Sequence, residues 1–175
     1  MRALIVVDMQ NDFVDKRGAL FVEDAPFVIP RINEEVKLHN LVVLTACNHP
    51  EDDPSFKDYG GPWPAHCLRG SWGAWFHPRL EPTVSVADMI LRKVGYSAFF
   101  QNGMTTGLHE YLRANWVDSL VIAGVALDYC VGETAKDAAR LGYEVTLPLH
   151  LTAAVVEGAE GRVAEELRRE GVRVT

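Results

Sequence analysis

The sequence lacks any concentration of positive charge that a polyanionic partner would need. Its 17 lysine and arginine residues are outnumbered by 24 acidic residues, which gives a net charge of −7. No long block of basic residues interrupts this balance. Binding to nucleic acids depends largely on basic side chains that neutralise phosphates, so we expect no nucleic acid partner.

Long hydrophobic runs are also missing. The apolar segment ALIVV near the N-terminus, residues 3 to 7, ends at Asp8. It is too short for the core of a signal peptide or for a membrane-spanning helix, which needs roughly 20 apolar residues. We therefore expect a cytoplasmic protein with no membrane partner.

Cysteine is scarce. The chain has three, Cys47, Cys67 and Cys130, and an odd number does not fit a disulfide framework. Thiol chemistry, metal binding and simple packing remain as roles for each of them.

The chain is long enough to form a hydrophobic core. With 175 residues, of which 48% are hydrophobic, it is expected to form one domain over residues 1–175. The sequence contains no internal repeat and no stretch with the composition of a linker.

Short apolar segments alternate with helical patterns along the chain. The apolar segments are rich in β-branched residues, as in buried parallel strands, and the helical patterns lie between most of them. This alternation predicts an α/β fold, a three-layer sandwich in which a mainly parallel sheet of about six strands has helices on both faces. The expected strands are residues 3–7, 41–46, 88–93, 119–125, 143–147 and 172–174, and the expected helices are 26–39, 105–115, 130–141 and 157–170.

One long segment, residues 47–87, does not follow this alternation. It contains six of the nine prolines and three of the four tryptophans, with little periodicity. Long loops within compact domains are commonly functional, so we expect an active-site loop here.

Three chemically capable residues are expected at the carboxyl ends of strands, where ligands of open α/β sheets bind. Asp8 follows the first strand, Lys93 ends the third, and Cys130 follows the fourth at the start of the helix expected at 130–141. A helix N-terminus and a nearby lysine both favour the reactive thiolate. Asp8 is placed to take the thiol proton and return it to a leaving amine, and backbone N–H groups around Ala126 and Cys130 are placed to bind an oxyanion.

Each of these residues also has a simpler explanation. A cysteine after a strand is more often a packing residue than a nucleophile. An aspartate at that position is often a turn former, and Lys93 is compatible with a solvated position. The residues alone leave both interpretations open.

The long loop carries a second group of candidate residues. Cys47, His49, Asp53 and His66 are side chains that bind zinc or iron, although their spacing is not that of a standard zinc finger. Loop histidines more often pack or face solvent, and Asp53 lies in EDDP, a composition that favours turns. Spacing alone therefore leaves the metal site open.

Taken together, several stretches resemble the nicotinamidases of the isochorismatase-like cysteine hydrolase superfamily. They are ALIVVDMQNDFV, WPAHC, RKVGYSAF and GVALDYCV, and the resemblance covers essentially the whole chain. It implies hydrolysis of nicotinamide to nicotinate and ammonia through a cysteine thioester, as part of NAD salvage. It also implies a small-molecule amide as the substrate and a homo-oligomer as the assembly.

The resemblance assigns roles to individual residues. It implies a catalytic triad of Asp8, Lys93 and Cys130, with a cis peptide between Val125 and Ala126 that directs the oxyanion-binding N–H groups of Ala126 and Cys130. The residues that it places against the substrate are Phe13, Trp63, Tyr96, Ala126 and Tyr129.

The resemblance also implies a divalent metal that binds the ring nitrogen of the substrate. His49 and His66 fit the family pattern, but Cys47 stands where an aspartate is expected and Asp53 where a second histidine often stands. Thiolate and carboxylate are both competent ligands, and a thiolate shifts the preference toward zinc, with iron or manganese as alternatives. Cys67, next to His66, is interpreted as buried and structural.

Two further functions stay open alongside nicotinamide hydrolysis. One is a metal-free cysteine hydrolase of the same superfamily that acts on another small amide or a carbamoyl compound. The other is a non-catalytic binding protein, which fits less well because all three triad residues are present. No G-x-G-x-x-G motif follows the first strand, so no nucleotide cofactor is expected.

Overall fold

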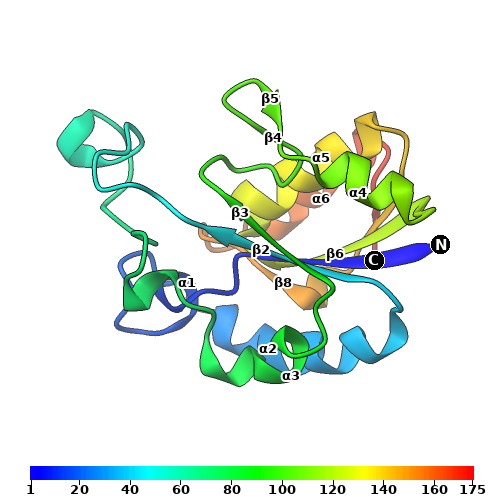
Figure 1. Cartoon of the computed structure of the whole chain (residues 1–175), viewed down its shortest axis with the longest axis horizontal. Coiled ribbons are helices and arrows are strands. Elements are labelled where there is room, and N and C mark those ends of the chain that lie inside the picture. Colours follow the sequence, from blue (N-terminus) through cyan, green and yellow to red (C-terminus); the bar gives the residue numbers. More distant parts are fainter.

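The centre of the protein is a parallel β-sheet (Figure 1). The structure is a computed structural model that describes residues 1–175. The seven strands lie in the order β3-β2-β1-β6-β7-β9, with β8 paired to the end of β6, and every pairing within this sheet is parallel. The strands are β1 (Arg2–Val7), β2 (Val42–Cys47), β3 (Met89–Lys93), β6 (Ser119–Val125), β7 (Glu144–Leu147), β8 (Thr152–Ala153) and β9 (Arg173–Val174).

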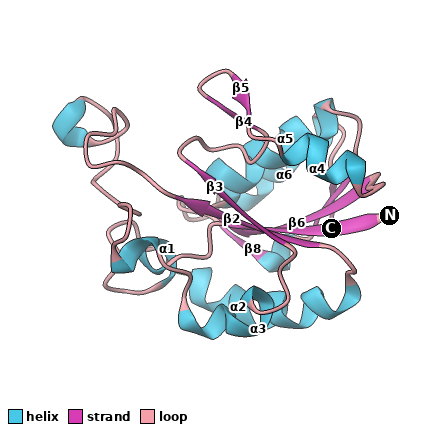
Figure 2. Cartoon of the chain, viewed as in Figure 1, coloured by secondary structure: helices cyan, strands magenta, loops and turns pink.

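Helices cover both faces of the sheet (Figure 2). One face carries α2 (Ala25–Glu35) and α3 (Glu81–Val84), and the other carries α4 (Leu108–Ala114), α5 (Gly132–Arg140) and α6 (Glu160–Arg169). The short helix α1 (Asn11–Val14) follows β1 directly. None of these helices combines the length and the apolar character that crossing a bilayer would require.

The alternation of side chains along each strand builds two cores. In β1, Leu4 and Val6 join a cluster of 19 buried residues that includes those of α2. Ala3, Ile5 and Val7 point the other way and join a cluster of 27 that includes residues of α4, α5 and α6. A strand buried on both faces needs apolar residues at every position, which explains the continuous run ALIVV. The predicted three-layer fold is confirmed, and β8 is a strand that the sequence did not reveal.

Three of the expected helices begin later than predicted, and one of them, expected from 157, is α6, which starts at Glu160. Residues 104 and 105 form strand β5 (Met104–Thr105), which pairs with β4 (Phe100–Gln101), so α4 starts only at Leu108. The helix expected from 130 is preceded by a π-helical turn, η5 (Leu127–Val131). Cys130 therefore lies within this turn and not at the first residue of α5.

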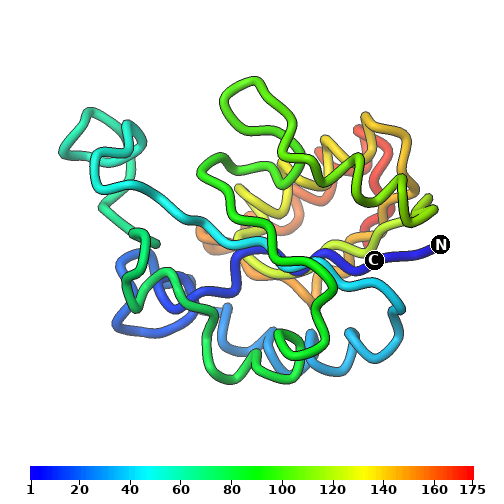
Figure 3. The backbone as a smooth tube through the Cα atoms, viewed as in Figure 1, coloured from blue at the N-terminus to red at the C-terminus, as the bar shows by residue number.

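The long loop projects beyond the carboxyl ends of β1 and β2, as the cyan and green stretch of Figure 3 shows. Its regular structure is limited to the single turns η2 (Lys57–Tyr59), η3 (Trp72–Ala74) and η4 (Pro78–Leu80) and to α3. Prolines explain this, because they remove backbone donors and restrict the preceding residue.

Gly124 in β6 is required by the close approach of β1. It has φ of +108°, and a Cβ atom there would overlap the carbonyl oxygen of Val7. Gly124→Ala is therefore expected to destabilise the protein by roughly 3 kcal/mol or more. Gly142→Ala is the control, because Gly142 also has a positive φ, +89°, but open space around it, and should cost roughly 1–2 kcal/mol. Urea denaturation compares the two, and equal losses would contradict the overlap.

Candidate active site

The carboxyl end of the sheet brings together the three residues that the sequence singled out. Asp8 follows β1, Lys93 is the last residue of β3, and Cys130 lies in the turn after β6. The ammonium of Lys93 lies 2.7 Å from Asp8 Oδ2 and 3.5 Å from Cys130 Sγ. All three residues are buried, Asp8 and Lys93 almost completely. A thiol, a cation and a carboxylate thus form one contiguous group.

Fixed hydrogen bonds hold the carboxylate in this group. The hydroxyl of Thr45 donates to Asp8 Oδ1 at 2.6 Å, while the backbone N–H of Asp8 donates to the Thr45 carbonyl at 3.2 Å. Lys93 also donates to the carbonyl of Gly95 at 2.9 Å. Each charged side chain therefore has polar partners beyond the ion pair, as buried charges require.

The charge state of Lys93 follows from its neighbours. Burial alone would lower the pKa of Lys93, but the Asp8 carboxylate and the thiols of Cys130 and Cys47 outweigh this and hold that pKa well above its ordinary value. Lys93 therefore stays an ammonium ion, which favours negative charge on the adjacent sulfur.

Cys47 lies in this same group. It is the last residue of β2, paired in register with Lys93, and its Sγ lies 3.3 Å from Asp8 Oδ2 and 3.6 Å from Lys93 Nζ. One carboxylate oxygen of Asp8 and the sulfurs of Cys47 and Cys130 all lie within 4.8 Å of one another. A hydrogen bond to Cys130, burial and the Asp8 charge raise the pKa of Cys47 well above its ordinary value. The sequence grouped Cys47 with the loop histidines, and the structure places its thiol beside that of Cys130.

The loop histidines form a separate pair. The Nδ1–H of His49 donates to Asp53 Oδ2 at 2.7 Å, and the Nδ1–H of His66 donates to the carbonyl of Pro64 at 2.8 Å. The ring centroids of the two histidines are 4.7 Å apart. Burial lowers the pKa of His66, so its ring is neutral near pH 7. His66 thus keeps an unprotonated Nε2, and in both rings the Nδ1–H is engaged within the protein, the arrangement of histidines prepared to bind a metal through Nε2.

Asp53 fixes the orientation of one histidine of this pair, His49. Its Oδ2 accepts from His49, and its Oδ1 accepts from the backbone N–H of Ser55 at 2.9 Å. Both carboxylate oxygens are thus engaged within the loop, and Asp53 does not line the cavity. It orients His49, a role that the sequence did not predict, since its position there indicated a metal ligand or a turn residue.

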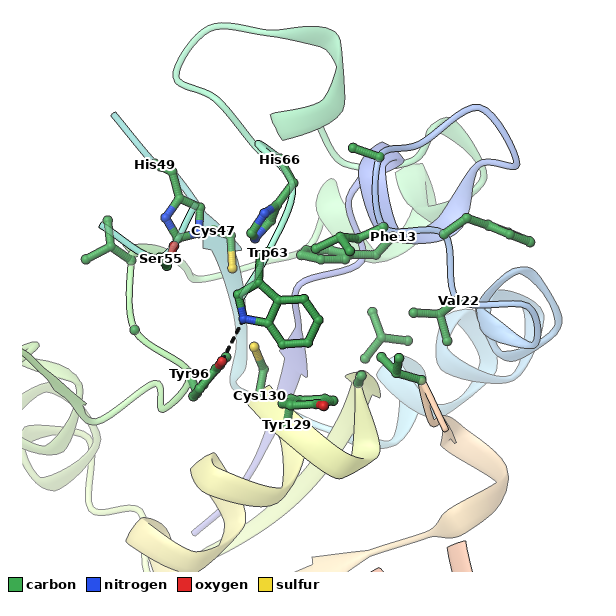
Figure 4. A pocket seen from close by; sticks show the side chains of 18 residues that line it. Phe13, Val22, Cys47, His49, Ser55, Trp63, His66, Tyr96, Tyr129 and Cys130 are labelled. Atoms are coloured by element: carbon green, nitrogen blue, oxygen red, sulfur yellow. Dashed lines mark hydrogen bonds between the residues drawn. The ribbon is translucent and has the colours of Figure 1, made fainter. Parts of the chain in front are cut away.

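A cavity of about 410 Å³ is lined by both Cys130 and the histidine pair (Figure 4). Of its 18 lining residues, 14 are hydrophobic, and the side chains of His49, His66, Cys47 and Cys130 contribute to the same wall. The indole N–H of Trp63 donates to the hydroxyl of Tyr96 at 2.8 Å. Such a site suits a flat ring with one polar end. The aromatic residues in its wall are Phe13, Phe21, Trp63, Tyr96 and Tyr129.

The peptide bond between Val125 and Ala126 is cis. Ala126 lines the cavity, and its N–H donates no hydrogen bond within the protein. A free N–H group beside the nucleophile is the kind of donor that an oxyanion needs.

Gln10 and Thr45 are site residues that sequence reasoning missed. Gln10 is fully buried, and its Nε2 donates to the carbonyls of Cys47 and Ala74, both at 2.8 Å. Its Oε1 accepts from the N–H of Cys47 at 2.7 Å. Gln10 directly follows DM in the first matched stretch, where a polar residue after a buried strand was the available signal.

Cys67 has a structural place. It is completely buried, and its N–H donates to Asp12 Oδ2 at 2.6 Å. Burial, reinforced by the charge of Asp12, raises the pKa of its thiol. The prediction of a buried structural cysteine agrees with this environment.

The parallel sheet and the buried cysteine, lysine and aspartate are those of an α/β cysteine hydrolase. The model of the isochorismatase domain matches residues 2–175, and the chain belongs to this family. The resemblance drawn from the sequence is thereby confirmed.

Three relatives show how close the similarity is. The nicotinamidase/pyrazinamidase of Mycobacterium tuberculosis is 34% identical over 187 residues, covering 99% of this chain and 98% of that protein. The structure of PnC1 from L. infantum in complex with nicotinate matches with a TM-score of 0.96 and 36% identity, covering 100% of this chain and 92% of that one. Pyrazinamidase of Pyrococcus horikoshii in complex with zinc matches with a TM-score of 0.84 and 36% identity, covering 99% and 98%.

Thr45 should be important for the stability of the buried carboxylate. Thr45→Val keeps the shape of the side chain but removes the hydroxyl that donates to Asp8, so it is expected to lower the free energy of unfolding by about 1–3 kcal/mol. Thr45→Ser retains the hydroxyl and should lose less. Urea denaturation of the two variants measures this, and a Thr45→Val protein as stable as the parent would contradict the role of the hydroxyl.

Proposed function

We propose that this chain hydrolyses nicotinamide to nicotinate and ammonia, an amidohydrolase reaction at a carboxamide C–N bond that belongs to NAD salvage. The observation that carries the proposal is the Cys130 sulfur beside the Lys93–Asp8 ion pair in an aromatic-walled cavity. The nicotinamidase relative and the nicotinate-bound neighbour support the choice of substrate. The predicted single domain, cytoplasmic location and homo-oligomeric state stay predictions.

In the proposed reaction, Phe13 and Trp63 hold the pyridine ring and the carboxamide faces Cys130. The thiol proton passes to Asp8, and Lys93 stabilises the resulting thiolate. The sulfur attacks the carboxamide carbon, and the N–H groups of Ala126 and Cys130 bind the developing oxyanion. Tyr96 and Tyr129 complete the wall and limit the entry of water.

Collapse of this intermediate requires a proton on the leaving nitrogen. Asp8 donates the proton that it took from the thiol, the C–N bond breaks, and ammonia leaves behind a thioester on Cys130. Water then adds to the thioester carbon and gives a proton to Asp8. Breakage of the C–S bond releases nicotinic acid, which ionises to nicotinate, and Asp8 returns its proton to the sulfur. One water is consumed and one ammonia is produced.

A divalent metal fits beside this group. His49 and His66 would hold it through their Nε2 atoms, because Asp53 and the Pro64 carbonyl already occupy their Nδ1–H groups. Two imidazoles suit zinc, with iron or manganese as alternatives. A metal held there would supply a Lewis acid that could anchor the ring through its pyridine nitrogen. Cys47, the predicted third ligand, contacts Asp8 and Lys93, so the proposal rests on the imidazole pair.

Ammonia release from nicotinamide tests the function. The parent protein should release ammonia steadily, and Cys130→Ala should reduce kcat by roughly a thousandfold or more, since the thioester cannot form. Circular dichroism should show that the variant is folded. Appreciable turnover by Cys130→Ala would contradict the thioester route. A folded parent protein that leaves nicotinamide intact would contradict the substrate and favour another small amide.

Elemental analysis tests the metal site. Protein purified without chelator should carry a divalent metal, and His49→Ala and His66→Ala should each lose most of it because one of the two nitrogen ligands is removed. His77→Ala is the matched control, since His77 belongs to the same loop but does not line the cavity. Metal content that is unchanged in His49→Ala and His66→Ala would contradict this assignment.

A further inference from the structure

A second thiol lies beside the proposed nucleophile, and the proposed reaction does not use it. The sulfurs of Cys47 and Cys130 lie within 4.8 Å of each other, and both line the cavity. Figure 4 shows the two sulfur atoms directed toward one another below His49 and His66. Cys47 is only 4% exposed and Cys130 only 8%, so a reagent from solvent reaches their sulfurs only through this cavity.

The pair does not have the character of a resident metal site. Asp8, Cys47 and Cys130 already enclose a cation, because the Lys93 ammonium contacts Asp8 Oδ2 at 2.7 Å and the two sulfurs at 3.6 and 3.5 Å. A metal ion would have to displace this ammonium from its buried ion pair. The chemistry that remains for two adjacent thiols is oxidation.

We propose that Cys47 and Cys130 are a site of oxidative modification, at which a hydroperoxide that enters the cavity converts the two thiols into a disulfide. Cys130 is the attacked and Cys47 the resolving cysteine. The inference rests on the proposed function in one respect, that Cys130 is the reactive thiol.

The first step oxidises Cys130. Its thiolate attacks one oxygen of the peroxide, the O–O bond breaks, and the sulfur becomes a sulfenic acid, S–OH. The other oxygen leaves as hydroxide, or as alkoxide from an organic hydroperoxide, and takes up a proton to become water or an alcohol. The Lys93 ammonium that favours thiolate for amide hydrolysis favours it here too.

The second step uses Cys47. Its sulfur attacks the sulfenic sulfur of Cys130, the S–O bond breaks, and the hydroxyl departs as water after gaining a proton. The proton of the Cys47 thiol passes to Asp8, whose Oδ2 lies 3.3 Å from the sulfur. In sum, two thiols and one hydroperoxide give one disulfide, one water and one further water or alcohol. The sulfurs close from within 4.8 Å to about 2 Å, the length of a disulfide bond.

Cys67 is not the partner in this reaction. It is completely buried, does not line the cavity and contacts the carbonyl of Gly73 at 3.8 Å. It therefore supplies an internal control for thiol chemistry that does not depend on the cavity.

Peptide mapping tests the proposal. The purified full chain is treated with hydrogen peroxide in small molar excess, free thiols are blocked with N-ethylmaleimide, and the non-reduced digest is analysed by mass spectrometry. The expected product is a peptide pair linked through Cys47 and Cys130, which dithiothreitol separates. A map in which Cys130 goes directly to sulfinic acid without a linked peptide would overturn the proposal, and so would a link that includes Cys67.

Variants sharpen the result. In Cys47→Ser the linked peptide should be absent, and Cys130 should accumulate as sulfinic and sulfonic acid, forms that dithiothreitol does not reduce. Cys67→Ala should give the same linked peptide as the parent chain. Over-oxidation of Cys130 that is no greater in Cys47→Ser than in the parent would contradict the resolving role. If Cys47→Ser does not fold, the map of the parent chain decides alone.

Mass spectrometry of the disulfide tests this proposal independently of the proposed nicotinamidase activity. The disulfide is detected by mass whether or not nicotinamide is hydrolysed. If the protein is active, peroxide should abolish ammonia release, and dithiothreitol should restore most of it in the parent chain. If it is inactive toward nicotinamide but forms the linked peptide, only the substrate assignment fails.

Discussion

The buried ion pair between Asp8 and Lys93 is the interaction on which the site depends. Removing both charges from water costs several kcal/mol per ion, and only close contact with further hydrogen bonds offsets that cost. Here the contact is 2.7 Å, and Thr45, Gly95 and the two sulfurs supply the remaining partners. Loss of one member would leave the other charge buried and unpaired. The ion pair therefore depends on the carboxyl ends of β1 and β3 keeping their relative positions.

The strand order explains why Cys47 joins this pair. In the sheet, β2 lies between β3 and β1, so its last residue necessarily lies between Lys93 and Asp8. β6 is the other neighbour of β1 and brings Cys130 to the opposite side of Asp8. Four side chains from four strand ends thus meet at one point. Cys47, the last residue of β2, therefore lies next to both the Asp8 carboxylate and the Lys93 ammonium, and its side chain is a thiol.

The sequence predicted the parts of this arrangement that depend on local pattern. β-branched runs separated by helical periodicity were enough for the parallel sheet. Position at strand ends was enough to make Asp8, Lys93 and Cys130 candidates, and the family resemblance then implied the triad. The environment of Cys47 was not predictable, because it depends on which strands are neighbours and apolar runs do not encode their order. Asp53 was equally ambiguous, since turn formation, metal binding and support of a histidine share one spacing. The predicted start of a helix was wrong where strand pairing outweighed helix propensity, as at residues 104 and 105.

Gln10 has a consequence for how this scaffold can vary. Its one side chain binds both Cys47, where the long loop departs, and Ala74, where the loop comes back beside α1. These two points are thus held together, and the residues between them form a closed part of the loop. Lengthening a closed loop costs little, about 0.6 kcal/mol for each doubling. Insertions and deletions between these anchor points can therefore reshape the cavity wall while the charged group beneath keeps its register.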